Sequence, residues 1–214
     1  VKSDSTELIT SRVADARKIA RTDLPAGVTA YVTGPEGFQA DIAGVFAGAD
    51  FKLLMATVIV VALLLLITYR SPILWLIPLL VVGTADGVSG QAARQVLGLF
   101  GIVPDGSVTG ILSVLVFGAG TNYALLLISR YREELLLNQD RHDAMRKAVR
   151  EAGPAIIASG STVTLALLSL SFANLEGTRS LGLACATGVV VAMISALTAL
   201  PAALVIFGRG IFWP

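Results

Sequence analysis

Residues 53–68 form an uncharged, almost wholly apolar run. With its flanks, this run can cross the roughly 30 Å hydrocarbon core of a bilayer, which takes about 20 residues in a helix. The rest of the chain has a similar character: 55% of its 214 residues are hydrophobic and 14% are charged, against about 25% charged in a soluble domain. The sequence therefore predicts an integral membrane protein, and it excludes a disordered, fibrous or disulfide-built chain.

The apolar pattern predicts an all-α polytopic bundle of five transmembrane helices. Apolar runs and the polar turns between them place these helices at about 51–69, 73–99, 107–128, 154–173 and 179–207. Residues 130–151 mix charges with apolar side chains and predict one amphipathic helix on the cytoplasmic membrane surface. Residues 208–214 are then a cytoplasmic exit segment.

Residues 1–50 predict a small α+β fragment outside the membrane. A helical pattern covers about 7–20, the β-branched run Val28–Thr33 predicts one strand, and a helix is expected over 37–50. One strand with two helices cannot bury a core, so we expect the C-terminal part of a larger extracytoplasmic domain. The chain begins with Val1 and shows no signal peptide, so we expect a piece of a longer protein.

The basic residues orient the bundle. If five helices alternate, one side receives most of the basic residues: Arg70, Arg130, Arg132, Arg141, Arg146, Lys147, Arg150 and Arg209. The other side receives Lys52, Arg94 and Arg179. An excess of lysine and arginine marks the cytoplasmic side. The chain is therefore predicted to be a multi-pass protein of the cytoplasmic membrane, with residues 1–50 extracytoplasmic.

Asn122 is the polar residue of the third span that most needs a partner. It lies eight residues from Arg130, or about 12 Å along a helix, where an unpartnered amide costs several kcal/mol. We expect it to face other helices or a wet cavity. The amide is either a helix–helix contact or part of a polar relay or ion site, and Tyr123 beside it is either packing or part of the same relay.

Two further sets of polar side chains could support such a site. Ser159, Thr162 and Ser169 approximate one stripe of the fourth span and could bond Asn122, or could bond their own helix backbone. Asp86 is the one acid deep in an apolar segment. It either has a functional task or lines a water-filled entrance in the outer half of the membrane.

Other functional classes lack the residues that they need. The spans hold no histidine to activate a serine and no second aspartate for a paired-carboxylate protease. One histidine and one cysteine cannot build a metal site, and no phosphate-binding glycine loop occurs. The net charge of +1 gives no field for nucleic acid. The sequence predicts no enzyme, metal, cofactor or nucleic-acid partner.

Residues 116–135, VFGAGTNYALLLISRYREEL, strongly resemble the fourth transmembrane helix of the mycobacterial-membrane-protein-large (MmpL) family of the resistance–nodulation–division (RND) superfamily. Other stretches are similar to the family's porter domain, turns, cytoplasmic helix and fifth and sixth helices: 33–35 near Asp41, 69–72, 140–145, 152–156 and 208–214. The resemblance implies helices two to six of the first repeat of a protein with about twelve helices.

The resemblance also implies a function. Proteins of this family export lipids or other hydrophobic molecules, driven by the proton gradient, so protons, membrane lipids and the second repeat are the implied partners. The family's Asp-Tyr pair falls on Asn122 and Tyr123. An amide cannot take up and release a proton near neutral pH. Either the asparagine is an engineered replacement that locks one state, or a natural subfamily relays protons elsewhere. A non-transporting membrane scaffold or sterol-sensing-like module, and a small-drug efflux pump, are the alternatives.

Overall fold

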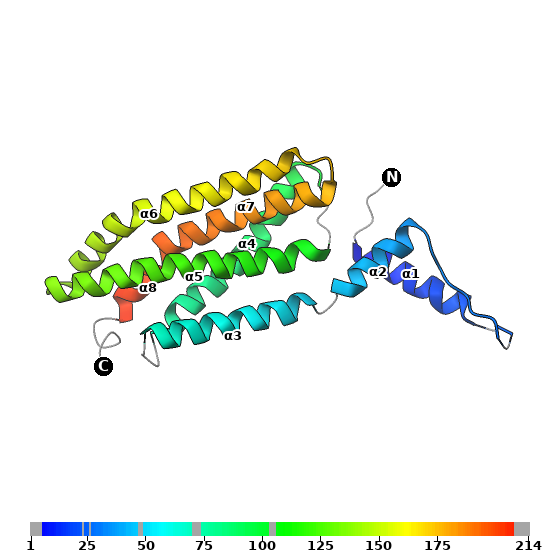
Figure 1. Ribbon diagram of the computed structural model, residues 1–214, viewed down its shortest axis with the longest axis horizontal. Coiled ribbons are helices and arrows are strands. Elements are labelled where there is room, and N and C mark those ends of the chain that lie inside the picture. Colours follow the sequence, from blue (N-terminus) through cyan, green and yellow to red (C-terminus); the bar gives the residue numbers. More distant parts are fainter. Residues whose placement is uncertain are drawn as a thin grey trace.

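The computed structural model describes residues 6–22, 24–25, 27–46, 49–69, 74–102 and 106–207. Its helices are α1 (Thr6–Ala20), α2 (Pro35–Phe46), α3 (Ala49–Tyr69), α4 (Leu76–Leu99), α5 (Gly106–Leu137), α6 (Arg141–Ser169), the 3₁₀ turn η1 (Leu170–Phe172), α7 (Glu176–Leu197) and α8 (Ala199–Phe207). In Figure 1 the helices α3 to α8 form an elongated bundle, and α1 and α2 project from one end of it.

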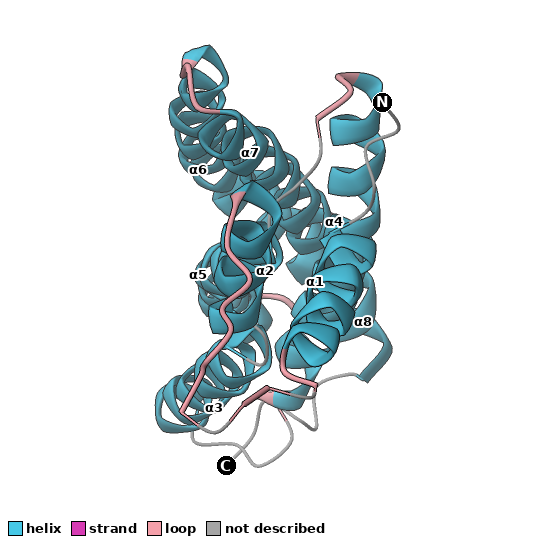
Figure 2. Cartoon of the chain, turned by 90° about the vertical axis from the view of Figure 1, so that its right-hand side faces the viewer, coloured by secondary structure: helices cyan, strands magenta, loops and turns pink. Residues whose placement is uncertain are grey.

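Helices α5 and α7 form the centre of the bundle. The α5 helix packs against α3, α4, α6 and α7, and α7 packs against α4, α5 and α6. Figure 2 shows the same bundle from the end that carries α1 and α2. The apolar core between these helices contains fully buried Leu65, Leu127, Ile156 and Leu204. The helix expected over 107–128 thus has neighbours on several sides, which positions its polar residues.

Four helices are long and apolar enough to cross a membrane: 76–99, 108–137, 141–172 and 176–206. The first predicted span, 51–69, corresponds to α3, whose described apolar part, 52–67, is shorter. The α3 helix exposes a series of apolar side chains that suits a lipid environment: Leu53, Met55, Ile59, Val60, Leu63, Leu64, Leu66 and Ile67. The chain is a multi-pass membrane protein, and the count of five spans stays a prediction.

The single amphipathic helix predicted over 130–151 is wrong. The α5 helix runs on to Leu137 and α6 begins at Arg141, so the stretch is divided between two helices. Side-chain caps set the division. The Asn138 amide donates to the Glu134 backbone carbonyl (3.0 Å). Asp140 accepts from the backbone N–H of His142 (2.8 Å), a bond that lowers the pKa of Asp140 and caps the first turn of α6.

At two prolines, the observed helix bounds differ from those predicted for the fourth and fifth spans. The fourth was expected to begin at Pro154, yet Pro154 lies inside α6, because packing of its neighbours outweighs the one helical hydrogen bond that proline removes. The fifth was expected to be one helix over 179–207. It is interrupted at Thr198, between α7 and α8. Pro201 explains this break, since its ring crowds the carbonyl four residues earlier, that of Leu197.

The predicted α+β character of the N-terminal fragment is also wrong in the described residues. Residues 28–33 form no strand and connect α1 to α2, because a lone extended segment has no neighbour to complete its hydrogen bonds. The helix expected over 37–50 is α2, Pro35–Phe46. Arg17 of α1 pairs with Asp41 of α2 at 2.7 Å, and this contact lowers the pKa of Asp41.

Two of the polar turns expected between the predicted spans, and the predicted exit segment, lie wholly or largely outside the described residues. They are the turn at Arg70-Ser71-Pro72, most of the turn at Pro104-Asp105-Gly106 and the exit segment 208–214.

We expect Gly182→Ala to destabilise the fold by about 1–3 kcal/mol, the usual cost of overpacking. A Cβ atom at Gly182 in α7 would lie 2.7 Å from both the Leu167 carbonyl oxygen and the Leu170 Cβ atom. The backbone carbonyl cannot rotate away as a side chain can. The measurement is the thermal unfolding of the full-length protein in detergent.

Gly83→Ala is the matched control for that variant. Gly83 is also helical, but a Cβ atom there has open space around it. Alanine should therefore leave stability unchanged or raise it by up to about 1 kcal/mol. Equal melting temperatures for Gly182→Ala and Gly83→Ala would contradict the close packing of α7 on the end of α6.

Candidate functional site

Tyr123 is a deeply buried polar side chain in the middle of the central helix α5. It is 1% exposed, and its hydroxyl is hydrogen-bonded to the Ser159 side chain of α6. A buried tyrosine hydroxyl commonly finds such a partner, because an unpaired one is costly in an apolar setting. The bond joins the middle of α5 to the middle of α6.

Gly160 makes room for this contact. A Cβ atom at Gly160 would lie 3.2 Å from the Tyr123 hydroxyl oxygen and 2.7 Å from the Met193 sulfur of α7. The site therefore lies where α5, α6 and α7 meet. Reasoning from sequence missed Gly160 and Met193, although an isolated glycine inside a helical pattern is a signal for close packing.

The Asn122 side chain does not take part in this contact between α5, α6 and α7. This side chain is exposed, as is Gly118 one turn earlier, and a Cβ atom at Gly118 would have open space around it. The expectation that Asn122 faces the serine–threonine stripe of α6 is wrong. Successive residues on a helix are 100° apart, and Tyr123 takes the direction that faces α6. Asn122 and Gly118 thus lie on an open face of α5.

Only one member of the predicted serine–threonine stripe meets α5. Ser159 bonds Tyr123. Thr162 is exposed and donates to the Ala158 carbonyl of its own helix (2.9 Å), and Ser169 donates to the Ala166 carbonyl (2.6 Å). Bonding to the own helix backbone, the second interpretation offered for these residues, therefore describes Thr162 and Ser169.

Asp86 belongs to a separate contact. It lies half-buried on α4 and is hydrogen-bonded to Ser113 of α5. Ser113 lies about three turns before Tyr123 on α5, so the structure does not bring Asp86 together with Tyr123 and Ser159. Its carboxyl group has a partner across the α4–α5 interface that reasoning from sequence did not identify.

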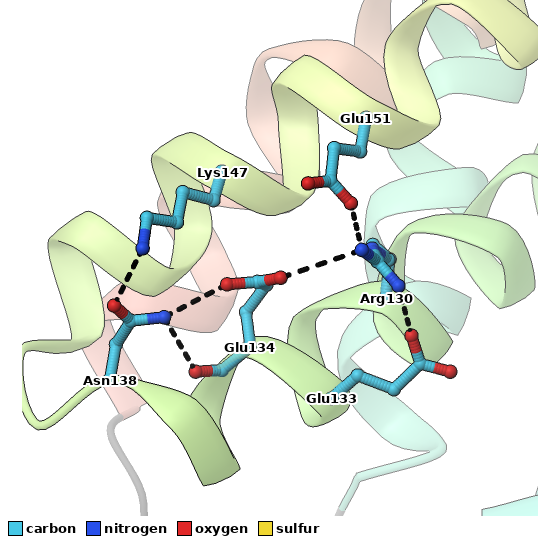
Figure 3. Close-up of polar contacts among 6 residues, drawn as sticks. All are labelled: Arg130, Glu133, Glu134, Asn138, Lys147 and Glu151. Carbon is cyan, nitrogen blue, oxygen red and sulfur yellow. Dashed lines mark hydrogen bonds and ion pairs between the residues drawn. The ribbon is translucent and has the colours of Figure 1, made fainter.

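A cluster of polar side chains joins the far ends of the same two helices (Figure 3). Arg130 at the end of α5 contacts Glu133 and Glu134 of its own helix and Glu151 of α6. Asn138 donates to the Glu134 carboxylate at 2.8 Å and accepts from Lys147 of α6 at 2.9 Å; both bonds are drawn in Figure 3. Glu134 is 5% exposed.

Other features carry no comparable chemistry. A groove of about 830 Å³ lies between α1 and α2, lined in part by Arg17, Lys18 and Asp41, but it is open and shares no residue with the α5–α6 contact. In the described part of the chain, no three histidine, cysteine, aspartate or glutamate side chains lie together to hold a metal ion.

Comparison with known proteins identifies the family. The model of the MMPL family matches residues 2–214. The chain belongs to the MMPL family. A putative membrane protein of Streptomyces coelicolor, ActII-3, is 47% identical over 211 residues, which is 99% of this chain and 30% of that protein. The apo-petrobactin exporter of Bacillus anthracis is 40% identical over 223 residues, again 30% of its length.

Mycobacterial transport proteins of the MMPL family are also similar. The probable transport protein MmpL10 of Mycobacterium leprae is 35% identical over 189 residues, or 86% of this chain and 19% of that protein. The chain therefore spans about a third or less of the length of these relatives. Several of them are named transport proteins or exporters, so this MMPL chain is related to membrane transporters.

Proposed function

We propose that this chain is part of one repeat of an exporter that moves lipids or other hydrophobic molecules across the cytoplasmic membrane, driven by the proton-motive force. One observation supports the location of the coupling site. A buried tyrosine hydroxyl, that of Tyr123, is bonded to Ser159 in the middle of two membrane-capable helices. Polar groups at such depth commonly belong to ion or proton pathways.

The open face of α5 is the second element of the proposal. Asn122 and Gly118 are exposed there, although an amide in hydrocarbon costs several kcal/mol. We propose that a helix from the rest of the full-length protein, its second repeat, covers this face. Gly118 lets that helix approach closely, and its polar side chains partner position 122.

The relatives support a chemical class of cargo but do not identify one substrate. The similarity to MmpL transport proteins supports a hydrophobic cargo, whereas one relative is named for export of apo-petrobactin. A pump for small molecules is therefore the variant of this proposal that a specific relative supports. Residues 1–50, which we propose to be extracytoplasmic, together with the remainder of the porter domain would select the cargo.

A non-transporting scaffold or sterol-sensing-like module is the alternative, and Asn122 is the observation that favours it. An amide at this position can hold helices together by hydrogen bonding but cannot exchange protons. In that case Tyr123 and Ser159 would serve packing alone.

Transport into vesicles tests the proposed function. The full-length protein is reconstituted in liposomes with a fluorescent lipid and, separately, with apo-petrobactin, and a pH gradient is imposed. We expect gradient-dependent movement of one cargo that a protonophore abolishes. Protein-free liposomes are the control. Cargo movement that a protonophore leaves unchanged would contradict proton coupling, and no movement of either cargo would favour the scaffold.

A further inference from the structure

The contact between Tyr123 and Ser159 depends on how far α6 is displaced along α5, and the buried face of α6 fixes this displacement weakly. Seven residues of α6 are buried, and five of them are alanine or glycine: Ala144, Ala148, Ala152, Gly153 and Gly160. Helices lock into register when side-chain ridges fill grooves on the neighbour. Alanine and glycine offer only shallow ridges, and Met145 and Ile156 are the two larger side chains of this face, so polar contacts between the helices can contribute to the register of this helix pair.

Pro154 weakens the backbone hydrogen bonding of α6 close to its contacts with α5. It lies between Glu151 and Ser159, and it removes the helical hydrogen bond that the Arg150 carbonyl would otherwise accept. The segment of α6 that precedes Pro154 is thus held less firmly by the rest of its own helix. A contact from α5 to this segment can therefore decide where it lies.

Arg130 supplies that contact. Its Nη1 atom contacts Glu133, and its Nη2 atom lies 3.6 Å from Glu134 and also contacts Glu151. The two carboxylates of α5 hold the guanidinium in place, and Glu134 is itself bonded by Asn138. In Figure 3 the guanidinium lies between the two helices, with Glu151 reaching down to it from α6. A planar guanidinium fixed in this way imposes direction as well as charge.

The Arg130–Glu151 contact and the Tyr123–Ser159 contact lie about the same distance apart along α5 as along α6. Arg130 is seven residues beyond Tyr123, and Glu151 is eight residues before Ser159, which are distances of about 10–12 Å along each antiparallel helix. A slide of α6 by one residue, about 1.5 Å, would therefore both strain the ion pair and move Ser159 away from the tyrosine hydroxyl.

We infer that Arg130 is a positioning residue, which through Glu151 sets the register of α6 against α5 and so keeps the Tyr123 hydroxyl on Ser159. The part that this register plays in transport rests on the function proposed above, whereas the register itself does not. Because Arg130 and Glu151 are 38% and 46% exposed, the pair contributes little to overall stability, and its effect should appear in geometry instead.

The test is the ¹⁹F NMR spectrum of the full-length protein labelled with 3-fluorotyrosine, in which Tyr123→Phe identifies the Tyr123 resonance. We expect Glu151→Gln and Arg130→Gln to shift or broaden this resonance while the melting temperature stays nearly unchanged. Glu151→Asp keeps the charge and should restore much of the original position. Asp143→Asn, which removes an exposed ion pair within α6 that does not involve Arg130, is the matched control and should leave the resonance in place.

Two results would overturn the inference. The first is a Tyr123 resonance that is unchanged in Glu151→Gln and in Arg130→Gln. The second is a change of equal size in Asp143→Asn, which would trace the effect to the loss of any surface charge near these helix ends and not to the Arg130–Glu151 pair. Since the spectrum requires no transport, failure of the vesicle assay would count against the proposed function and not against the positioning role.

Discussion

Replacing Asn122 by aspartate should raise gradient-driven export by the full-length protein at least about tenfold, which corresponds to roughly 1.4 kcal/mol of coupling free energy. Asparagine and aspartate have nearly the same shape, but only the carboxyl group can take up and release a proton. Carboxyl groups held away from water keep their protons to higher pH, which brings exchange closer to neutrality. The measurement is cargo movement into vesicles at matched protein content.

The control for this substitution is stability. Asparagine and aspartic acid have nearly the same size and similar hydrogen-bonding groups, so Asn122→Asp should leave the melting temperature of the full-length protein within a few degrees. Asn174→Asp, the same chemical change in the exposed connection between η1 and α7, should leave transport unchanged. If Asn122→Asp and the original protein export equally well, protons take another route, and the role proposed for position 122 is wrong.

The spans could be predicted from hydropathy because apolar length is a local property. The helix ends near Arg130–Glu151 could not be predicted in the same way, since a charged, amphipathic stretch can continue a helix or begin a new one. Asn138 and Asp140 decided the outcome by capping. Both residue types favour such positions, so this signal was present in the sequence but was outweighed by the charge pattern.

The direction of the site residues was harder to predict than their positions. Asn122 and Tyr123 are adjacent and both polar, so sequence alone could not decide which of them faces α6. Apolar packing of the bulkier side chain settled it, since Tyr123 is buried between α5, α6 and α7. The partners of Ser159 and Asp86 depend on contacts between helices far apart in sequence, and periodicity does not contain this information.

The strand predicted at Val28–Thr33 illustrates a different limit. β-Branched residues favour extended backbone, but a strand exists only when a neighbour completes its hydrogen bonds. The described residues contain no such neighbour for it, and α1 and α2 pack on each other instead. Local preference thus predicted the conformation of a segment whose structure depends on longer-range pairing.

On the Asn122→Asp background, Tyr123→Phe should lower gradient-driven export at least about tenfold, again roughly 1.4 kcal/mol of coupling. The substitution removes only the hydroxyl that is bonded to Ser159. The ring continues to fill its place among α5, α6 and α7. Loss of one such hydrogen bond costs about 0.5–1.5 kcal/mol of stability, so the protein should still fold. Transport and melting temperature are measured on the same preparations.

Tyr131→Phe is the matched control for this change. Tyr131 is also fully buried on α5, 0% exposed, but it lies eight residues further along the chain, about 12 Å from the level of Ser159. If the hydroxyl of Tyr123 acts in coupling, its removal should lower export while removal of the Tyr131 hydroxyl should not. An equal loss in both variants would show that export responds to any lost buried hydroxyl on α5, and Tyr123 would then be a packing residue.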